Sequence, residues 1–380
     1  MSKKLLLSLL ALTLFINDAS AWIPDRRRLY EDRDENVYMV IPALASMPGV
    51  GVFVGVLGSF SNLWGSGVDA AVTEAQTVGN SDGTGSDIHI RAYALREVPL
   101  LIPGLTFEYW FGDIKFNDYY SYLPGRDSPN YLIPYTGEFN YYFLRPSYRL
   151  WERRFELSYN LVFFKGYEIN SAGQEVLQAS HAASGQIKLD FTDDWVDPHK
   201  GLRMTYSTNL RAPKKSILGT SNTEEDPRSE QVKTHQYNLG LYLPWGEQTT
   251  LALYREWCSA QGLEESDQVI TCGFLRLRGY PGGRWSDRFA QTKIAELRYS
   301  IPTNLDMDWL LVHGKLEGLQ LAGFYEEGQV SPQDDERLTQ DIHRSYGAGV
   351  RALIDAIVLR LDLGFSEEGP QTHLTIDHAF

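Results

Sequence analysis

The sequence is poor in cysteine, in positive charge and in long apolar runs. Two cysteines allow only one intramolecular pairing. After the first 21 residues no segment reaches the ~18 consecutive apolar residues of a transmembrane helix, which argues against a helical membrane protein. Lysine and arginine number 35 against 49 aspartates and glutamates, for a net charge of -14. A nucleic-acid partner is therefore not expected, because its phosphates need basic neutralisation.

Motifs for catalysis and metal binding carry little support. His-x-x-x-His metal spacing does not occur, and the one Gly-x-Ser-x-Gly match, at 79–83, lies in a polar stretch between two expected strands, outside the strand-to-helix turn that a nucleophile motif needs. The sequence therefore predicts a protein that is not an enzyme and has no cofactor or metal, although a Ser–His pair like that of outer-membrane lipases stays open as an alternative. What the chain does have is 13% aromatic residues and 33 glycines, a mixture that favours β structure.

The N-terminus has the pattern of an export signal. Lys3 and Lys4 precede an apolar stretch over 5–16, and Ala19-Ser20-Ala21 fits a small-residue cleavage site. We therefore predict a signal peptide over 1–21, with a short membrane anchor as the alternative. Residues 22–36 are charged and too few to bury a core, so no independent domain is expected there.

The rest of the chain alternates between apolar and polar residues with a period of two. Leu202, Met204 and Tyr206, for example, alternate with polar or charged neighbours. This period is typical of half-polar strands. We expect about sixteen of them, at 37–45, 50–60, 67–77, 86–96, 104–114, 135–146, 153–166, 182–193, 201–212, 232–243, 248–257, 290–301, 316–327, 345–354, 357–366 and 371–380.

The connections between these strands distinguish two β architectures. Long ones are expected at 115–134, 167–181, 213–231, 258–289 and 328–344, separated by short turns, with 302–315 as an exception. Alternating long and short connections in an even-stranded meander are typical of outer-membrane barrels. A soluble β-sandwich gives the same residue alternation but has no reason to place its long loops at one end. The fold class predicted is thus all-β, a transmembrane antiparallel barrel over 37–380.

Several segments of the second half occur in a characteristic order and spacing. Together they resemble the barrel of the bacterial surface antigen superfamily, which includes the BamA and TamA insertases and the TpsB transporters of two-partner secretion. The resemblance covers roughly 185–380 and rests on seven segments: 190–194, 197–201, 276–280, 295–299, 323–328, 345–351 and 359–365.

The resemblance implies that the long loop at 258–289 folds into the lumen. Arg278, Gly279 and Tyr280 match the loop tip of that family, and Glu296 matches an acidic residue of the inner wall. Glu326 stands where the family usually has aspartate. Strand parity independently puts Glu296 and Glu326 on the polar face, where carboxylates could form forked bonds with a guanidinium. The alternative is that Arg278 is a solvated loop charge and that the acids line a wet lumen.

Two further features are candidates for a role. Cys258 and Cys272 bracket the start of the same loop, and in an exported chain we expect a disulfide there, with two free thiols as the alternative. Phe380 ends the chain, and by parity shares a strand face with Leu374 and Ile376. A terminal aromatic strand resembles the signal that the barrel-assembly machinery recognises in its clients, and it also suits an interfacial aromatic girdle.

Three functions remain open at this stage. The chain could assist insertion or translocation of protein or lipid at the bacterial outer membrane, as the resemblance implies. It could instead be a passive porin-like channel or a structural surface antigen without transport. The family's insertases and transporters carry periplasmic POTRA domains, and we expect none within this sequence. The expected partners are outer-membrane lipids, the barrel-assembly machinery during biogenesis, and an unknown client or periplasmic protein.

Overall fold

The computed structural model describes residues 37–47, 51–78, 87–122, 132–169, 175–213, 232–261, 277–281, 284–285, 287–332, 341–354, 357–376 and 380. Sixteen strands lie in these residues. They are β1 (Val37–Met47), β2 (Gly51–Ser61), β3 (Asp69–Val78), β4 (Asp87–Pro99), β5 (Leu105–Tyr122), β6 (Leu132–Leu150), β7 (Phe155–Ile169), β8 (Glu175–Asp190), β9 (Gly201–Pro213), β10 (Val232–Pro244), β11 (Thr249–Gln261), β12 (Phe289–Trp309), β13 (Val312–Ser331), β14 (His343–Ile354), β15 (Ile357–Ser366) and β16 (Gly369–Ile376). A single 3-10 turn, Leu63–Gly65, is the only helical element of these residues, and no helix among them could cross a membrane.

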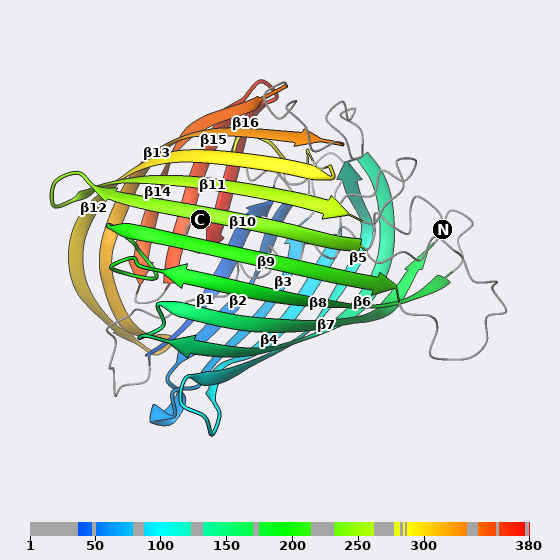
Figure 1. Ribbon diagram of the computed structural model, residues 1–380, viewed down its shortest axis with the longest axis horizontal. Coiled ribbons are helices and arrows are strands. Elements are labelled where there is room, and N and C mark those ends of the chain that lie inside the picture. Colours follow the sequence, from blue (N-terminus) through cyan, green and yellow to red (C-terminus); the bar gives the residue numbers. More distant parts are fainter. Residues whose placement is uncertain are drawn as a thin grey trace.

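The strands form one closed antiparallel barrel in which each pairs with its neighbours in the chain (Figure 1). The predicted fold class and the number of strands are confirmed. The longest intervals between consecutive strands, 214–231 and 262–288, follow β9 and β11, which run in the same direction and so finish at the same end of the barrel. The opposite end has short ones, such as 245–248 and 310–311.

The expectation of a loop at 302–315 is wrong. β12 continues to Trp309 and β13 begins at Val312, so only two residues connect them. The pairing of β12 with β13 shifts its register between Pro302 and Leu305. A bulge of this kind accommodates a proline that cannot donate to the ladder, and the strand continues beyond it.

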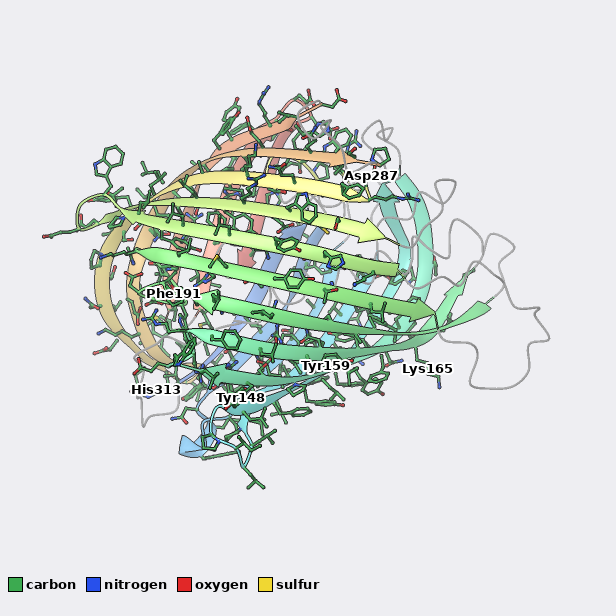
Figure 2. All side chains as sticks on the ribbon, in the orientation of Figure 1. Tyr148, Tyr159, Lys165, Phe191, Asp287 and His313 are labelled. Carbon is green, nitrogen blue, oxygen red and sulfur yellow. The ribbon has the colours of Figure 1, made fainter. Side chains whose placement is uncertain are left out.

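The wall of the barrel is apolar outside and polar inside. Outward Leu297, Leu319 and Leu361 are 43–45% exposed, and outward Tyr159 can be followed in Figure 2. Inward Gln320 and Asp362 are buried. This is the reverse of a soluble protein and suits a wall surrounded by lipid. At the short-turn end, Trp64, Trp151, Trp245 and Trp309 are all at least 70% exposed, as expected of an interfacial aromatic belt.

The barrel closes on a weak seam. In the described residues β1 and β16 share a single pair in register, Ser46 with Leu374, whereas β15 and β16 share eight. β14, β15 and β16 are short, so the start of β1 pairs with β13 instead, through Tyr38 with His313 and Met39 with Val312. β1 therefore changes partner along its length.

Candidate functional site

The loop that precedes β12 places Arg278 in the lumen, where its side chain meets three carboxylates. Nη1 donates to Glu296 at 2.7 Å and to Asp362 at 2.9 Å, while Nε donates to Glu326 at 2.6 Å. The backbone N–H of Arg278 donates to the second oxygen of Glu326 at 2.7 Å. The acids come from β12, β15 and β13, so one loop residue ties three strands together.

The surroundings hold this guanidinium in place. The guanidinium carbon lies 3.4 Å from the ring centroid of Phe324. The backbone carbonyl oxygen of Arg278 is 2.9 Å from a ring nitrogen of His373 on β16. Burial by itself would lower the pKa of Arg278, but the carboxylates of Glu326, Glu296 and Asp362 outweigh burial and raise it. The group is therefore a permanent cation, 5% exposed.

Gly279 is required by a close approach of two backbones. A Cβ at this position would lie 2.6 Å from the carbonyl oxygen of Phe365 and 2.6 Å from Cβ of Ser345. Gly364 on β15 provides the matching space, because a Cβ there would collide with the backbone of Arg278. The loop tip thus lies flat on the inner face of β14 and β15.

Tyr280 anchors the tip at the outer mouth. Its ring belongs to a buried cluster, and its hydroxyl donates to Glu367 in the β15–β16 turn at 3.3 Å. Burial, together with the Glu367 carboxylate, raises the pKa of the hydroxyl to about 12. Trp285 packs edge-on to Tyr280 and stacks on His343 at 3.8 Å. The other members of the cluster are Cys258, Ala260, Leu277, Ala290 and Val330.

The ion pairs continue beyond the tip. Glu296 also accepts from Arg298 at 2.8 Å and from Arg351 at 2.9 Å. Asp362 lies 3.3 Å from Arg360, and Arg298 lies 4.0 Å from Asp197. We call the eight residues Arg278, Glu296, Arg298, Glu326, Arg351, Arg360, Asp362 and Asp197 the lumen network. It has four cations and four anions. Among the described residues, no group of three or more His, Cys, Asp or Glu could hold a metal ion.

The network reaches a turn at the opposite end of the barrel. Asp197 lies in the β8–β9 connection, where Asp193 and Asp194 accept backbone hydrogen bonds that fold residues 193–200. Val196 of this turn packs on Leu353 and Val358, inward residues of β14 and β15. Because β8 and β9 are far from β14 and β15 in the ring, the turn crosses the lumen.

Phe380 does not lie on the lipid face of the last strand, so that placement was wrong. β16 ends at Ile376, and the Phe380 ring stacks on Tyr254 at 4.9 Å. The guanidinium of Arg298 lies 5.2 Å from the same ring, and the Tyr242 hydroxyl donates to the Phe380 carbonyl at 3.5 Å. Tyr254, Arg298 and Tyr242 are buried inward residues, so the C-terminal residue occupies the lumen. Its role as an assembly signal stays a prediction.

The structure leaves the cysteine pair open. Cys258 lies on β11 within the cluster around Tyr280, but Cys272 falls outside the described residues, so the disulfide stays a prediction.

Sequence reasoning brought Arg278, Glu296 and Glu326 together but missed Asp362, Arg298 and Arg351. Their signal was present, since all three are charged residues on the polar face of an alternating strand.

Comparisons with known proteins bear on the fold. No family model and no curated protein matches the sequence. Among solved structures, BamA from Haemophilus ducreyi lacking POTRA domains 1–3 is similar at 11% identity and a TM-score of 0.51, over 97% of this chain and 77% of that one. CdiB from Escherichia coli is similar at 11% identity and a TM-score of 0.57, over 93% of this chain and 63% of its own. CdiB from Acinetobacter baumannii is similar at 12% identity and a TM-score of 0.56, over 90% and 59% respectively. The chain therefore spans less than two thirds of either CdiB, and the predicted resemblance is confirmed at the level of the barrel fold.

Proposed function

We propose that this chain, which has the barrel fold of BamA and CdiB, is an outer-membrane protein that assists insertion or translocation of protein or lipid. The observation that carries the proposal is the seam, where β1 and β16 share one pair in register. A poorly paired strand exposes N–H and C=O groups that can pair with another chain. A barrel with such a seam can offer an edge to a client.

The loop tip is placed to control that seam. Arg278 contacts Asp362 on β15 and His373 on β16, and Ser366 donates to the carbonyl of Gly279 at 2.5 Å. These contacts hold the two last strands from inside the barrel. Undocking the tip would therefore loosen the side of the seam that β16 forms.

The contents of the lumen weigh against a passive channel. Arg278, Val196 and Phe380 all occupy it, on the evidence of their inward partners. Reconstituted in a planar bilayer, the protein should show no large steady conductance. A large, stable open state would favour the porin-like alternative instead.

A cysteine lock tests the proposal. Ser46→Cys combined with Leu374→Cys places a thiol pair at the one register position of the seam. In cells whose only copy is the variant, oxidation should cause the same changes in outer-membrane protein and lipid content as depletion of the protein. A reductant should reverse these changes. Each single variant is the control. Full function of a quantitatively crosslinked barrel would refute a role for the seam.

A further inference from the structure

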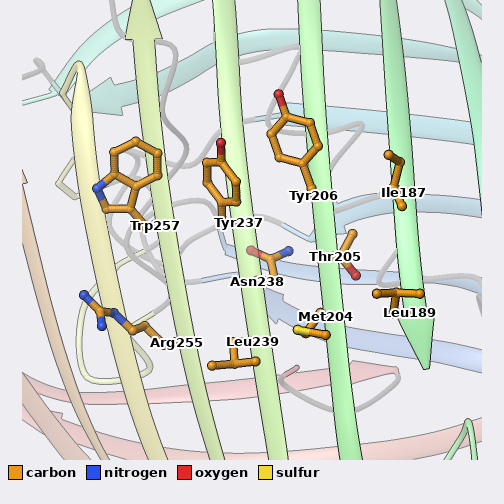
Figure 3. A pocket seen from close by; sticks show the side chains of 10 residues that line it. All are labelled: Ile187, Leu189, Met204, Thr205, Tyr206, Tyr237, Asn238, Leu239, Arg255 and Trp257. Atoms are coloured by element: carbon orange, nitrogen blue, oxygen red, sulfur yellow. The ribbon is translucent and has the colours of Figure 1, made fainter. Parts of the chain in front are cut away.

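The outer wall carries a groove of about 490 Å³ across β8, β9, β10 and β11. Its outward side chains form two rows that follow the register of the strands (Figure 3). The row nearer the long loops is Ile187, Tyr206, Tyr237 and Trp257, and the next row is Leu189, Met204, Leu239 and Arg255.

The first row is largely aromatic. The rings of Tyr206 and Tyr237 are 4.8 Å apart, and those of Tyr237 and Trp257 are 5.3 Å apart. Tyrosine and tryptophan gather where the apolar part of a membrane meets its headgroups. The groove therefore lies at the membrane boundary on the long-loop side, with aliphatic side chains beneath the rings.

Arg255 interrupts the aliphatic row with a charge. The next residue in register, on β12, is Lys293, so two cations stand side by side on the outer wall. With the amide of Gln291 turned so that its oxygen faces the guanidinium, that oxygen lies 3.2 and 3.3 Å from two nitrogens of Arg255. The amide is neutral and leaves the charge of Arg255 uncompensated.

Two other outward arginines have carboxylate partners. Arg91 pairs with Glu74 at 3.2 Å, and Arg344 pairs with Glu327 at 3.4 Å. Within the ranges that the structure describes, Arg255 has no carboxylate within 4.0 Å, whereas Lys293 faces Glu327 in register on the same outer face without an ion pair at that distance. A cation on the lipid-facing wall is unfavourable unless it reaches water or an anion, so an anion supplied by the membrane would suit Arg255, with Lys293 beside it.

We propose that the groove binds an anionic membrane lipid through its phosphate. Arg255 and Lys293 hold the phosphate of its headgroup, and an acyl chain lies along Met204, Leu239 and Leu189. A guanidinium forms forked, charge-assisted bonds with phosphate oxygens, and an ammonium adds a second point charge. The inference rests on the membrane location in the proposed function but not on activity in insertion or translocation.

Lipid binding to the purified full-length barrel in neutral detergent provides the test. By native mass spectrometry, dioleoyl phosphatidylglycerol should bind about tenfold more tightly than dioleoyl phosphatidylcholine, whose acyl chains are the same. The Arg255→Ala, Lys293→Ala double variant should lose that preference, and Arg255→Lys should keep part of it. Leu239→Trp, which fills the groove, should weaken binding of both lipids. Folding of each variant is checked by its mobility on unheated gels.

Arg91→Ala is the matched control, since it removes an outward arginine that already has a carboxylate partner. It should leave the preference for phosphatidylglycerol unchanged. Equal binding of the two lipids by the natural protein, or an equal loss in Arg91→Ala, would overturn the proposal. Competition by millimolar inorganic phosphate as strong as that by phosphatidylglycerol would identify a free-anion site and would also overturn it. None of these outcomes depends on whether the seam between β1 and β16 opens, so they test lipid binding separately from insertion or translocation.

Discussion

Replacing Arg278 by alanine should undock the loop tip, and the structure shows which carboxylate is left unpaired. Glu296 would keep Arg298 and Arg351, and Asp362 would keep Arg360. Glu326 has no other ion-pair partner among the described residues and, once the tip has left, would keep only its hydrogen bond from Ser345. The two glutamates therefore differ, because Glu296 keeps a counter-charge and Glu326 does not.

The magnitude follows from that single unpaired charge. Leaving one buried carboxylate without its partner costs about 3–5 kcal/mol. Arg278→Lys should recover part of this, because an ammonium keeps the charge but cannot span three carboxylates, and each lost charge-assisted bond is worth about 1.5–3 kcal/mol. Arg278→Ala also gives the lumen network four anions against three cations, so the best second change removes one anion.

The choice of that second change discriminates between mechanisms. Glu326→Gln in the Arg278→Ala background should restore much of the stability, because it removes the unpaired carboxylate and makes the network neutral. Glu296→Gln in the same background should make matters worse, since Arg298 and Arg351 would lose their shared partner. A rescue by either acid alike would mean that net charge alone matters, and not the pairing.

The assay is the free energy of unfolding in detergent, from urea titrations of the single and double variants. Cleavage within 262–288 by a protease reports undocking directly. Arg344→Ala, which removes an exposed arginine paired with Glu327, is the control and should change neither readout. Additive effects of Arg278→Ala and Glu326→Gln, each below about 1 kcal/mol, would refute docking of the tip on these acids.

Three other predictions concern the ends of the loop and of the chain. If Phe380 is an assembly signal, deleting it should reduce the amount of folded barrel in the membrane, as measured on unheated gels. Tyr254→Ala removes only the stacking partner of Phe380 in the lumen and should leave that amount unchanged. Equal amounts of folded barrel in the natural protein and both variants would exclude a role of Phe380 in assembly. Cys258 and Cys272 should form a disulfide that restricts the unfolded chain by about 3 kcal/mol, and mass spectrometry without reduction that finds two free thiols would contradict it. Tyr280 has a pKa raised to about 12, so its contribution to docking is complete below its usual pKa of 10.0 and is lost as the pH rises toward 12; loop cleavage should rise over that interval in the natural protein and less in Tyr280→Phe.

The strands could be predicted from the sequence because their signal is local. A period of two places every other residue on the lipid face, and this pattern gave sixteen strands close to those observed. The error at 302–315 has a local cause as well. Pro302 and Asn304 are typical of turns, but a bulge accommodates them within a strand that continues to Trp309.

The site could be predicted only for those residues whose partners the family resemblance implies. Arg278, Glu296 and Glu326 were found because their segments resemble a known arrangement. Arg298 and Asp362 lie in segments of the same resemblance, 295–299 and 359–365, but it assigned them no role. Many strands have inward polar residues, and the stagger of the strands determines which of them meet. Phe380 was misplaced because the alternation of strand faces was extended beyond Ile376, the last residue of β16.

The chemistry of the lumen network suits a latch that opens. An apolar plug of the same size would be held by the hydrophobic effect, at about 25 cal/mol per Å² of surface, and its removal would expose that surface to water. Guanidinium and carboxylate groups recover hydration when they separate, so a buried ion pair adds little net stability although it fixes geometry strongly. Arg278 can therefore hold β12, β13 and β15 in register while the tip is docked. Arg278 can leave without creating an apolar cavity, so the apolar surface that opening exposes is that of the cluster around Tyr280. The last strands that form the seam are then released.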